Sequence, residues 1–303
     1  MKRALIFGSN GFVGPYLTKE LSSRGFDVYE SDISSSKNLE THSFFPCDIT
    51  NSSTVFNLIN QVKPNYIVNL AAISSVSSSW KKPQLTYQIN VGGTINLLDS
   101  LVKQNNLSCK VLIVGSSEEY KQSNKPLSED SPLDSNNPYG LSKESQEKIA
   151  GLYSTKYGIP VIFTRSFNHT GVGQKETFVI PSFCKQVVDI EKGKAKNELL
   201  VGNLDAIRDF SDVRDIVSAY ANLLENESNG VFNVGSGIAH SIKEILEKII
   251  SKSNIDINYK VDKNKIRPLD TPYICCSKNK INSNFEYKID DTIEWILSNY
   301  RER

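Results

Sequence analysis

The stretch Ala4-Leu5-Ile6-Phe7-Gly8-Ser9-Asn10-Gly11-Phe12-Val13-Gly14 passes from an apolar run into a glycine-rich turn. We expect a buried strand over Arg3–Phe7 and a helix over Val13–Arg24. Glycines at the spacing GxxGxxG let backbone N–H groups approach a pyrophosphate, and the following helix N-terminus adds favourable partial charge. A turn directly after a buried strand is the context that a dinucleotide-binding motif requires. The candidate cofactor-binding residues are therefore Gly8, Asn10, Gly11, Phe12, Val13 and Gly14, with a turn that binds no ligand as the alternative.

Apolar runs of strand length alternate with segments of helix length through the first half of the chain. The expected strands are Arg3–Phe7, Asp27–Glu30, Ser43–Pro46, Tyr66–Leu70, Lys110–Val114 and Pro160–Thr164. The expected helices are Val13–Arg24, Ser53–Gln61, Pro83–Gln104 and Pro138–Tyr157. This alternation predicts an α/β fold of the Rossmann type, a doubly wound parallel sheet with helices on both faces.

The pattern loosens after Asn168, where Gly, Asn and Lys become frequent. A helix over Asp212–Glu225 and a strand over Gly230–Val234 are expected to return to the sheet. Helices over Ser241–Ser251 and Asp291–Asn299 are expected in a smaller lobe. The predicted organisation is a dinucleotide-binding domain over 1–168 plus part of 209–235, and a smaller C-terminal substrate-binding lobe over 169–208 and 236–303.

The charge balance excludes some classes of partner. The 303 residues carry 35 Lys+Arg against 34 Asp+Glu, a formal net charge of +1. Such a balance leaves no large field of one sign for nucleic acid or an anionic membrane, so we expect neither partner. No apolar run approaches the ~20 residues that span a bilayer. The apolar run at the N-terminus indicates a buried strand rather than a cleaved leader.

Cysteine and histidine usage gives no sign of a metal or a disulfide framework. The five cysteines are odd in number and scattered, and none forms a CxxC pair, so a reducing, cytoplasmic setting is expected. The three histidines lie far apart along the chain, and we expect no metal site.

Strand ends beyond the first turn supply further cofactor candidates. Asp32 follows Gly8 by 24 residues at the end of the second expected strand. A carboxylate there accepts both hydroxyls of an adenosine ribose and repels a 2′-phosphate, which favours NAD(H) over NADP(H). The alternative for Asp32 is a structural role at the start of a serine-rich loop. An acid after the third strand could meet the adenine amino group, and the candidates there are Asp48 and Ile49. Small residues after the fourth strand would let the backbone pass close to a cofactor, and the candidates there are Leu70, Ala71 and Ala72.

A catalytic pair is indicated by Tyr139 and Lys143, which stand at i and i+4 after Pro138. Proline favours a helix start, and this spacing puts both side chains on one helix face. A cation one turn away is expected to lower the tyrosine pKa from its usual ~10. Ser116, Ser117 and Glu118 follow the fifth strand, at the edge where doubly wound folds bind ligands. Ser116 could polarise a carbonyl, whereas Glu118 could be an acid-base group or a hydrogen-bond partner of sugar hydroxyls.

These residues together resemble the extended short-chain dehydrogenase/reductase family over essentially the whole chain. The resemblance includes Asn90-Val91-Gly92-Gly93-Thr94, and the segments 165–169, 201–210 and 267–270 are similar to those that bind nucleotide-sugars in that family. The resemblance implies that Tyr139 protonates a nascent C4 hydroxyl, that Lys143 lowers its pKa and holds the nicotinamide ribose, and that Ser116 polarises the ketone. It also implies a set of substrate-binding residues: Ser117, Glu118, Asn168, Val179, Arg208, Arg267 and Asp270. For Arg208, an ion pair with Asp209 or Asp212 is the alternative.

The activity that the resemblance implies is NAD(P)H-dependent reduction of the 4-keto group of a GDP-4-dehydro-6-deoxy-hexose, giving GDP-D-rhamnose from the D-mannose derivative. The alternatives are a GDP-mannose 4,6-dehydratase or a nucleotide-sugar 4-epimerase with tightly bound NAD(P), and a non-catalytic NAD-binding protein. Family members with this reductase activity often use NADP(H), whereas Asp32 favours NAD(H). Lys121 stands where those reductases usually have glycine. The resemblance further implies a homodimer formed through the helices at Pro83–Gln104 and Pro138–Tyr157.

Overall fold

The computed structural model describes residues 2–34, 43–226, 229–266, 271–277, 280–281 and 284–303. Contacts divide the chain into two compact units, which we call the first and the second unit. The first unit comprises residues 1–121, 129–166 and 217–234, and the second comprises 122–128, 167–216 and 235–303. The candidate dinucleotide turn and the Tyr139/Lys143 pair both belong to the first unit.

A seven-stranded parallel sheet forms the centre of the first unit, in the order β10-β6-β5-β4-β1-β2-β3. The strands are β1 (Lys2–Phe7), β2 (Phe26–Asp32), β3 (Phe44–Pro46), β4 (Tyr66–Asn69), β5 (Lys110–Val114), β6 (Val161–Ser166) and β10 (Gly230–Val234). The strand order reverses between β1 and β4, which is where open α/β sheets of this kind bind ligands. The sequence-based prediction of a doubly wound parallel sheet is confirmed.

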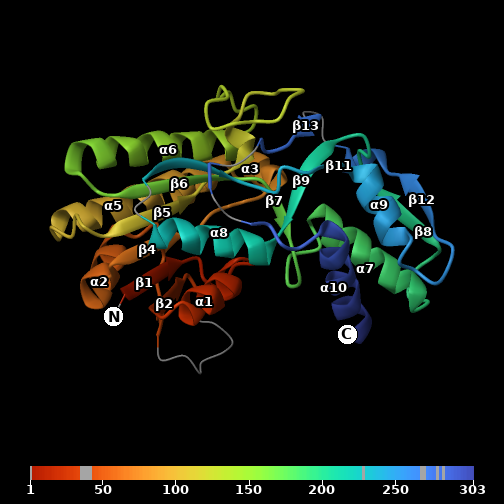
Figure 1. The fold of residues 1–303 in the computed structure, drawn as a ribbon, viewed down its shortest axis with the longest axis horizontal. Coiled ribbons are helices and arrows are strands. Elements are labelled where there is room, and N and C mark those ends of the chain that lie inside the picture. The colour runs from red at the N-terminus through yellow and green to blue at the C-terminus, as the bar shows by residue number, and fades with distance from the viewer. Residues whose placement is uncertain (1, 35–42, 227–228, 267–270, 278–279, 282–283) are drawn as a thin grey trace. The chain divides into compact units, whose positions relative to one another are not determined.

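Helices cover both faces of this sheet (Figure 1). Those of the first unit are α1 (Gly14–Ser23), α2 (Ser52–Val62), α3 (Val76–Lys81), α4 (Pro83–Tyr87), α5 (Gly93–Lys103) and α6 (Pro138–Tyr157), with α8 (Val213–Glu225) crossing from the second unit into the first. Leu5 and Phe7 alternate with Ala4 and Ile6 along β1, and all four are buried. Leu5 and Phe7 join the core formed with α2, α5 and α6. The sheet is therefore apolar on both faces, as a parallel sheet between helix layers requires.

A π-turn interrupts the helix that the sequence predicts as continuous over Pro83–Gln104. Residues Gln88–Gly92 form this wider turn between α4 and α5. Asn90 is fully buried there; its Oδ1 accepts the backbone N–H of Ile73 at 2.9 Å, and its Nδ2 donates to the hydroxyl of Ser142 at 2.8 Å. Single π-turns within α-helices are frequent at functional sites. This one binds the loop after β4 to α6, the helix that carries the candidate catalytic pair.

The second unit is built from short strands and three longer helices. β9 (Ile207–Asp212) pairs with β7 (Asn168–Thr170), β11 (Ala239–Ser241) and β13 (Tyr273–Ile274), while β8 (Glu198–Val201) pairs with β12 (Asn258–Val261). The helices α7 (Val179–Glu191), α9 (Ile242–Ile250) and α10 (Ile289–Glu302) pack around one apolar core. Short 3₁₀ turns lie at Ser117–Glu119 (η2, first unit) and Lys263–Lys265 (η3). Two helices were not anticipated from the sequence, α3 and α7. Among the described residues, no helix is long and apolar enough to cross a membrane.

The π-turn generates a prediction about stability. Asn90→Leu keeps the side-chain volume similar but leaves the buried N–H of Ile73 unpaired and removes the donor to Ser142, so we expect a loss of about 2–4 kcal/mol of unfolding free energy. Gln88→Leu, at an exposed position of the same turn, serves as the control and is expected to change it by less than about 0.5 kcal/mol. Urea unfolding followed by circular dichroism measures both, and equal losses would contradict the role given to Asn90.

Candidate functional site

The glycine-rich turn after β1 is packed backbone to backbone. Gly8 adopts φ +80°, a conformation that favours glycine, and its N–H donates to the carbonyl of Ser31 at 2.8 Å. An added Cβ at Gly8 would lie 2.7 Å from the backbone nitrogen of Ala71, and one at Gly14 would overlap the carbonyl oxygen of Ser9. Only hydrogen atoms fit at these positions. The turn is therefore a close backbone cradle that ends at the N-terminus of α1, the shape and polarity that suit a pyrophosphate.

Asp32 lies at the end of β2, directly beside this turn. Its Oδ2 accepts the N–H of Asn10 at 3.0 Å, and its Oδ1 accepts the N–H of Ile33 at 2.7 Å. The side chain of Asn10 donates in turn to the carbonyl of Ser34 at 2.7 Å. The carboxylate is thus fixed at the mouth of the turn, at the strand end where a ribose would be recognised.

The strand-end residues after β3 and β4 differ in what they do. Asp48 accepts the backbone N–H and the hydroxyl of Thr50 at 2.9 and 2.7 Å, so it stabilises its own loop. The Ile49 side chain packs in the core against Gly93. Leu70, Ala71 and Ala72 follow β4. The backbone of Ala71 lies against Gly8. Small residues at this strand end were expected to let the backbone pass close to a cofactor.

Ser116 and Tyr139 are brought together by the contact between η2 and the start of α6. Asn137 caps α6, because its Oδ1 accepts the N–H of Gly140 at 2.9 Å. A Cβ at Gly140 would overlap the carbonyl oxygen of Glu118, so the two backbones meet only because this residue is glycine. The Tyr139 phenol lies near the hydroxyl of Ser116, which acts on its pKa, and both residues are more than 90% buried.

Lys143 lies one turn further along α6 and is also buried. Its ammonium donates to the carbonyl of Val114 at 2.6 Å and to Gln146 Oε1 at 3.0 Å. Gln146 donates to the Thr94 hydroxyl at 2.6 Å, and Thr94 donates to the carbonyl of Asn90 at 2.9 Å. A chain of buried hydrogen bonds therefore runs from Lys143 to the π-turn, and it fixes the ammonium at the end of β5.

The pKa values of this pair differ from the sequence-based expectation. Burial is the main effect on Tyr139 and raises its pKa above the ordinary value, while the hydrogen bond from Ser116 opposes that rise. Burial lowers the pKa of Lys143 to about 8, opposed by the nearby carboxyl of Glu119. The expectation that a neighbouring cation lowers the pKa of Tyr139 is corrected, because desolvation of the phenolate dominates. In this structure the phenol is held in its neutral form.

Glu118 and Ser117 lie at the same strand end. The Glu118 Oε2 accepts from the Asn137 side chain at 3.0 Å, and the Glu118 N–H donates to the Ser116 hydroxyl at 3.2 Å. The Glu118 side chain is half-buried and Ser117 is buried. Glu118 is thus oriented by the residue that caps the Tyr139 helix.

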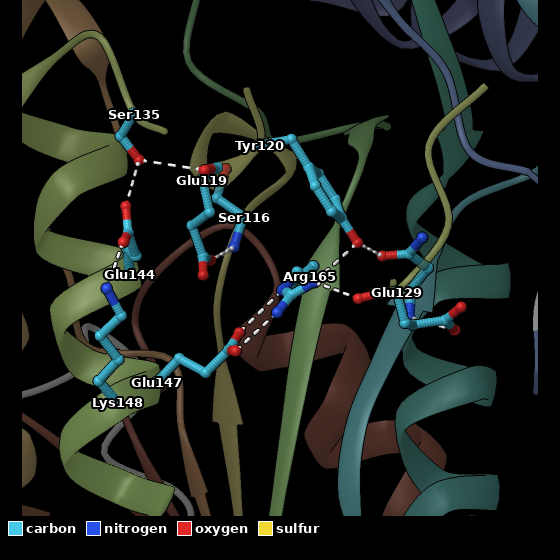
Figure 2. A network of polar contacts seen from close by, with 10 residues as sticks. Ser116, Glu119, Tyr120, Glu129, Ser135, Glu144, Glu147, Lys148 and Arg165 are labelled. Carbon is cyan, nitrogen blue, oxygen red and sulfur yellow. Dashed lines mark hydrogen bonds and ion pairs between the residues drawn. The ribbon is translucent and has the colours of Figure 1, made fainter. Parts of the chain in front are cut away.

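A buried polar network behind Ser116 was not identified from the sequence (Figure 2). Arg165 forms a two-pronged ion pair with Glu147 on α6, at 2.8 and 2.6 Å, and also donates to the Tyr120 hydroxyl at 3.1 Å. Glu119 accepts the N–H of Ser116 through Oε1 at 2.6 Å. The sequence signal for Glu119 was present as the Ser-x-x-Glu spacing of a capping box, which the structure contains. Arg165 belongs to a segment assigned to substrate, yet its guanidinium pairs within the first unit.

The predicted substrate residues in the second unit occupy separate elements. Asn168 begins β7 and is exposed, and Val179 begins α7 and packs partly against the core. Arg208 lies in β9, is 7% exposed, and donates from Nη1 to the carbonyl of Ile207 at 2.9 Å. Arg267 and Asp270 lie outside the described residues.

The two carboxylates considered as ion-pair partners of Arg208 are engaged by other groups. Asp209 accepts the backbone N–H groups of Ser236, Gly237 and Cys276. Asp212 pairs with Arg214 at 2.7 Å. Across the described part of the chain, no cluster of three or more His, Cys, Asp or Glu side chains is arranged to hold a metal ion.

The chain is similar to known proteins over most of its length. Residues 5–299 match the family model described as GDP-mannose 4,6 dehydratase. A GDP-6-deoxy-D-mannose reductase from Pseudomonas aeruginosa is 32% identical over 248 residues, covering 79% of this chain and 81% of that protein. A GDP-6-deoxy-D-talose 4-dehydrogenase from Aggregatibacter actinomycetemcomitans is 30% identical, covering 92% of this chain and 90% of that protein.

A solved structure of similar fold is that of RMD from Pseudomonas aeruginosa complexed with NADPH, with a TM-score of 0.87 and 28% sequence identity. The match covers 100% of this chain and 99% of that one. The chain belongs to the GDP-mannose 4,6-dehydratase family, within the extended short-chain dehydrogenases/reductases.

Proposed function

We propose that the protein reduces the 4-keto group of GDP-4-dehydro-6-deoxy-D-mannose to give GDP-D-rhamnose, with NADH or NADPH as reductant. The observation that carries the proposal is the buried site that Ser116 and Tyr139 share where η2 meets α6, with Lys143 fixed one turn away. The names of the relatives, a GDP-6-deoxy-D-mannose reductase and a GDP-6-deoxy-D-talose 4-dehydrogenase, support a GDP-linked deoxysugar as substrate.

The cofactor would be held by the residues of the glycine-rich turn and the strand ends beside it. Gly8, Gly11 and Gly14 would bring the backbone close to the pyrophosphate, and Asp32 would accept the hydroxyls of the adenosine ribose. When bound, a reduced nicotinamide supplies the hydride that the sugar ketone receives. Lys143 on α6, whose ammonium binds the carbonyl of Val114 at the end of β5, would hold the nicotinamide ribose.

Tyr139 and Ser116 would carry the proton chemistry. Ser116 donates a hydrogen bond to the ketone oxygen, which polarises the carbonyl. Tyr139 then transfers its phenolic proton to that oxygen as negative charge develops on it. The raised pKa of Tyr139 favours the neutral phenol, which is the form that reduction consumes. An enzyme that starts by oxidising a sugar hydroxyl would instead need the phenolate as a base.

The GDP part of the substrate is assigned to residues of the second unit. Asn168, Val179, Arg208 and Arg267 would hold it, together with Asp270, three residues after Arg267. A guanidinium suits this role because its planar fork matches the oxygens of a diphosphate. Ser117 and Glu118 at the end of β5 would contact the sugar.

A dehydratase is the second candidate, and Glu118 is the observation that favours it. Elimination of water needs an acid-base group near the sugar, and Glu118 is a half-buried carboxyl oriented by Asn137. The family model also bears the name of that activity. A 4-epimerase would use the same Tyr139 and Lys143 and would keep its cofactor bound. A non-catalytic binding protein would have no need of an acid such as Tyr139.

Reductant consumption tests the proposed reaction. Given GDP-4-dehydro-6-deoxy-D-mannose, the protein should oxidise one NADH or NADPH per ketosugar and form GDP-D-rhamnose, as followed by absorbance and by NMR of the product. Tyr139→Phe should lower kcat by about 10²–10⁴-fold while leaving the dinucleotide Kd within about twofold, because it removes only the proton donor. Tyr153→Phe on the same helix, whose hydroxyl binds Asp99, is the matched control.

Three outcomes would count against this assignment. No oxidation of either reductant with GDP-, UDP- or dTDP-linked 4-keto-6-deoxy sugars rejects the ketoreductase. Formation of a 4-ketosugar from GDP-mannose without added reductant favours the dehydratase. Turnover that is unchanged in Tyr139→Phe refutes the role of that residue in either reaction.

Cofactor preference should depend on Asp32. Asp32→Ser removes the carboxylate that would repel a 2′-phosphate, so the ratio of kcat/KM for NADPH to that for NADH should rise at least about tenfold, which is about 1.4 kcal/mol. Asp48→Ser is the control, because an adenine contact does not distinguish the two cofactors. An unchanged ratio in Asp32→Ser would show that Asp32 does not select the cofactor.

A homodimer through α4, α5 and α6 is part of the proposal. Leu141 and Leu152 are 45% and 68% exposed and stand eleven residues apart on α6, so they share one helix face. Trp80 and Leu85 are also exposed, on helices α3 and α4 that contact α6. Exposed apolar side chains gathered on neighbouring helices are typical of a protein–protein interface.

Light scattering after size exclusion tests this interface. Leu152→Glu buries a charge in the proposed interface and should convert a dimer to a monomer at micromolar concentration. Ile255→Glu, at an exposed apolar position of the second unit, should leave the mass unchanged. A monomeric wild-type chain, or a dimer that survives Leu152→Glu, would contradict the assignment.

A further inference from the structure

Glu119 is a fully buried carboxyl whose one strong contact is with the backbone of Ser116. Its exposed fraction is 0%, and Oε1 accepts the Ser116 N–H at 2.6 Å. The Ser116 side chain in turn accepts the N–H of Glu118 at 3.2 Å, which completes a capping box around η2. Within the described residues, the other oxygen, Oε2, has no hydrogen-bond donor. A buried polar atom left in this state is costly, so its retention calls for an explanation.

The space for this carboxyl is created by Gly115. A Cβ at Gly115 would lie 2.6 Å from Glu119 Oε1 and would overlap the ring of Phe163. The carboxyl therefore lies close to the backbone of Gly115, immediately before Ser116, and its Oε1 contacts the Ser116 peptide directly.

Charged groups surround Glu119 without satisfying it. Glu147 and Lys143 face it from α6, and Arg165 faces it from β6. Arg165 already makes two hydrogen bonds to Glu147, and Lys143 donates to Val114 and Gln146. The contact that remains specific to Glu119 is the amide of Ser116.

We propose that Glu119 is a positioning residue, whose buried carboxyl fixes the peptide of Ser116 and thereby aims the Ser116 hydroxyl at Tyr139 and the sugar ketone. This inference rests on the proposed ketoreduction for its activity readout. Ser116 stands just past the end of a strand, where the sheet no longer holds its N–H, and Glu119 supplies the missing acceptor. A displacement of about 1 Å at a reacting group can cost about 10²-fold in rate, so such an acceptor has a kinetic consequence.

The protonation state of Glu119 fits this role. Burial, and then the nearby Glu147, raise its pKa well above the ordinary value, against the opposing effects of the Ser116 N–H, Arg165 and Lys143. A neutral carboxyl still accepts the amide, and it places no negative charge beside Tyr139. An ionised Glu119 would raise the pKa of Tyr139 further.

Turnover of two Glu119 variants tests the positioning. Glu119→Leu removes the acceptor and should lower kcat by about 10–100-fold, with KM and the dinucleotide Kd within about threefold. Glu119→Gln keeps an acceptor oxygen and should retain kcat within about threefold. Glu129→Leu is the matched control, because Glu129 also accepts one backbone N–H, that of Asn233 at 3.0 Å, but does not touch Ser116. It should behave as the wild type.

The pH profile adds a readout that a merely structural role would not move. Loss of the Lys143 proton, whose pKa burial lowers to about 8, sets the alkaline limb, and the carboxylate of Glu119 moves that limb upward by raising the pKa of Lys143. Glu119→Gln carries no charge at any pH, so its alkaline limb should lie at lower pH than that of the wild type. Glu129→Gln should leave the limb in place. An unshifted limb in Glu119→Gln, or an equal loss of kcat in the two leucine variants, would overturn the proposal.

An amide resonance tests the same contact without any turnover. In protein labelled with ¹⁵N-serine, the Ser116 N–H, assigned by its loss in Ser116→Ala, should appear far downfield because its hydrogen bond to the carboxyl is short. It should remain downfield in Glu119→Gln and move upfield in Glu119→Leu. If the wild type reduces no ketosugar, the proposed function fails and this resonance still decides the contact. If Glu119→Leu does not fold, an undisplaced Ser116 resonance in the wild type rejects the proposal.

Discussion

The contact between Gly140 and the carbonyl of Glu118 is the constraint on which the catalytic geometry depends. Any side chain at residue 140 would separate the start of α6 from the turn that follows β5. Tyr139 is carried by the first of these elements and Ser116 by the second, so their hydroxyls stay close only while the backbones touch. Asn137 strengthens the junction from both sides, because it caps α6 and also holds Glu118.

The buried charges of the first unit serve a related purpose. Arg165 is placed between Glu147 and the Tyr120 ring, with its guanidinium 4.9 Å from the ring centre. Through these contacts, Arg165 on β6 links that strand to Glu147 on α6 and to Tyr120, which follows η2. Breaking a buried pair of this kind is costly because the remaining charge has no partner. The scaffold behind Ser116 is therefore held by polar contacts as well as by apolar packing.

The regular parts of the fold could be predicted from the sequence, because strand-length apolar runs and helix-length segments alternate with clear boundaries. The first strand, the glycine-rich turn and α6 follow that pattern closely. The π-turn could not be predicted, because the apolar periodicity on either side of Asn90 resembles one continuous helix. α7 was missed within a region where glycine and lysine are frequent, and its burial depends on packing against α9 and α10.

The candidate site was predictable to a similar extent. Ser116 and Tyr139 were identified from their types and spacing, whereas the pKa of Tyr139 depends on burial, which spacing does not reveal. The sequence does not distinguish Glu119 from Glu118, and an acid-base or sugar-binding role was predicted for Glu118 alone. Only the three-dimensional structure shows that one of these neighbouring carboxyls is half-buried on Asn137 and that the other is enclosed beneath Ser116.

The π-turn at Gln88–Gly92 also affects how the chain tolerates insertions and deletions. A π-turn is one residue longer than a regular helical turn, so removing one residue here would leave a continuous α-helix. The later positions of α5 would keep their faces, because the π-turn holds the extra residue locally. The same deletion between Thr94 and Leu97 would rotate every later position by about 100° around the helix axis and turn Leu97, Leu98 and Leu101 out of the core. A single-residue deletion at the π-turn would therefore spare the sheet packing and remove mainly the contacts of Asn90 with Ile73 and Ser142.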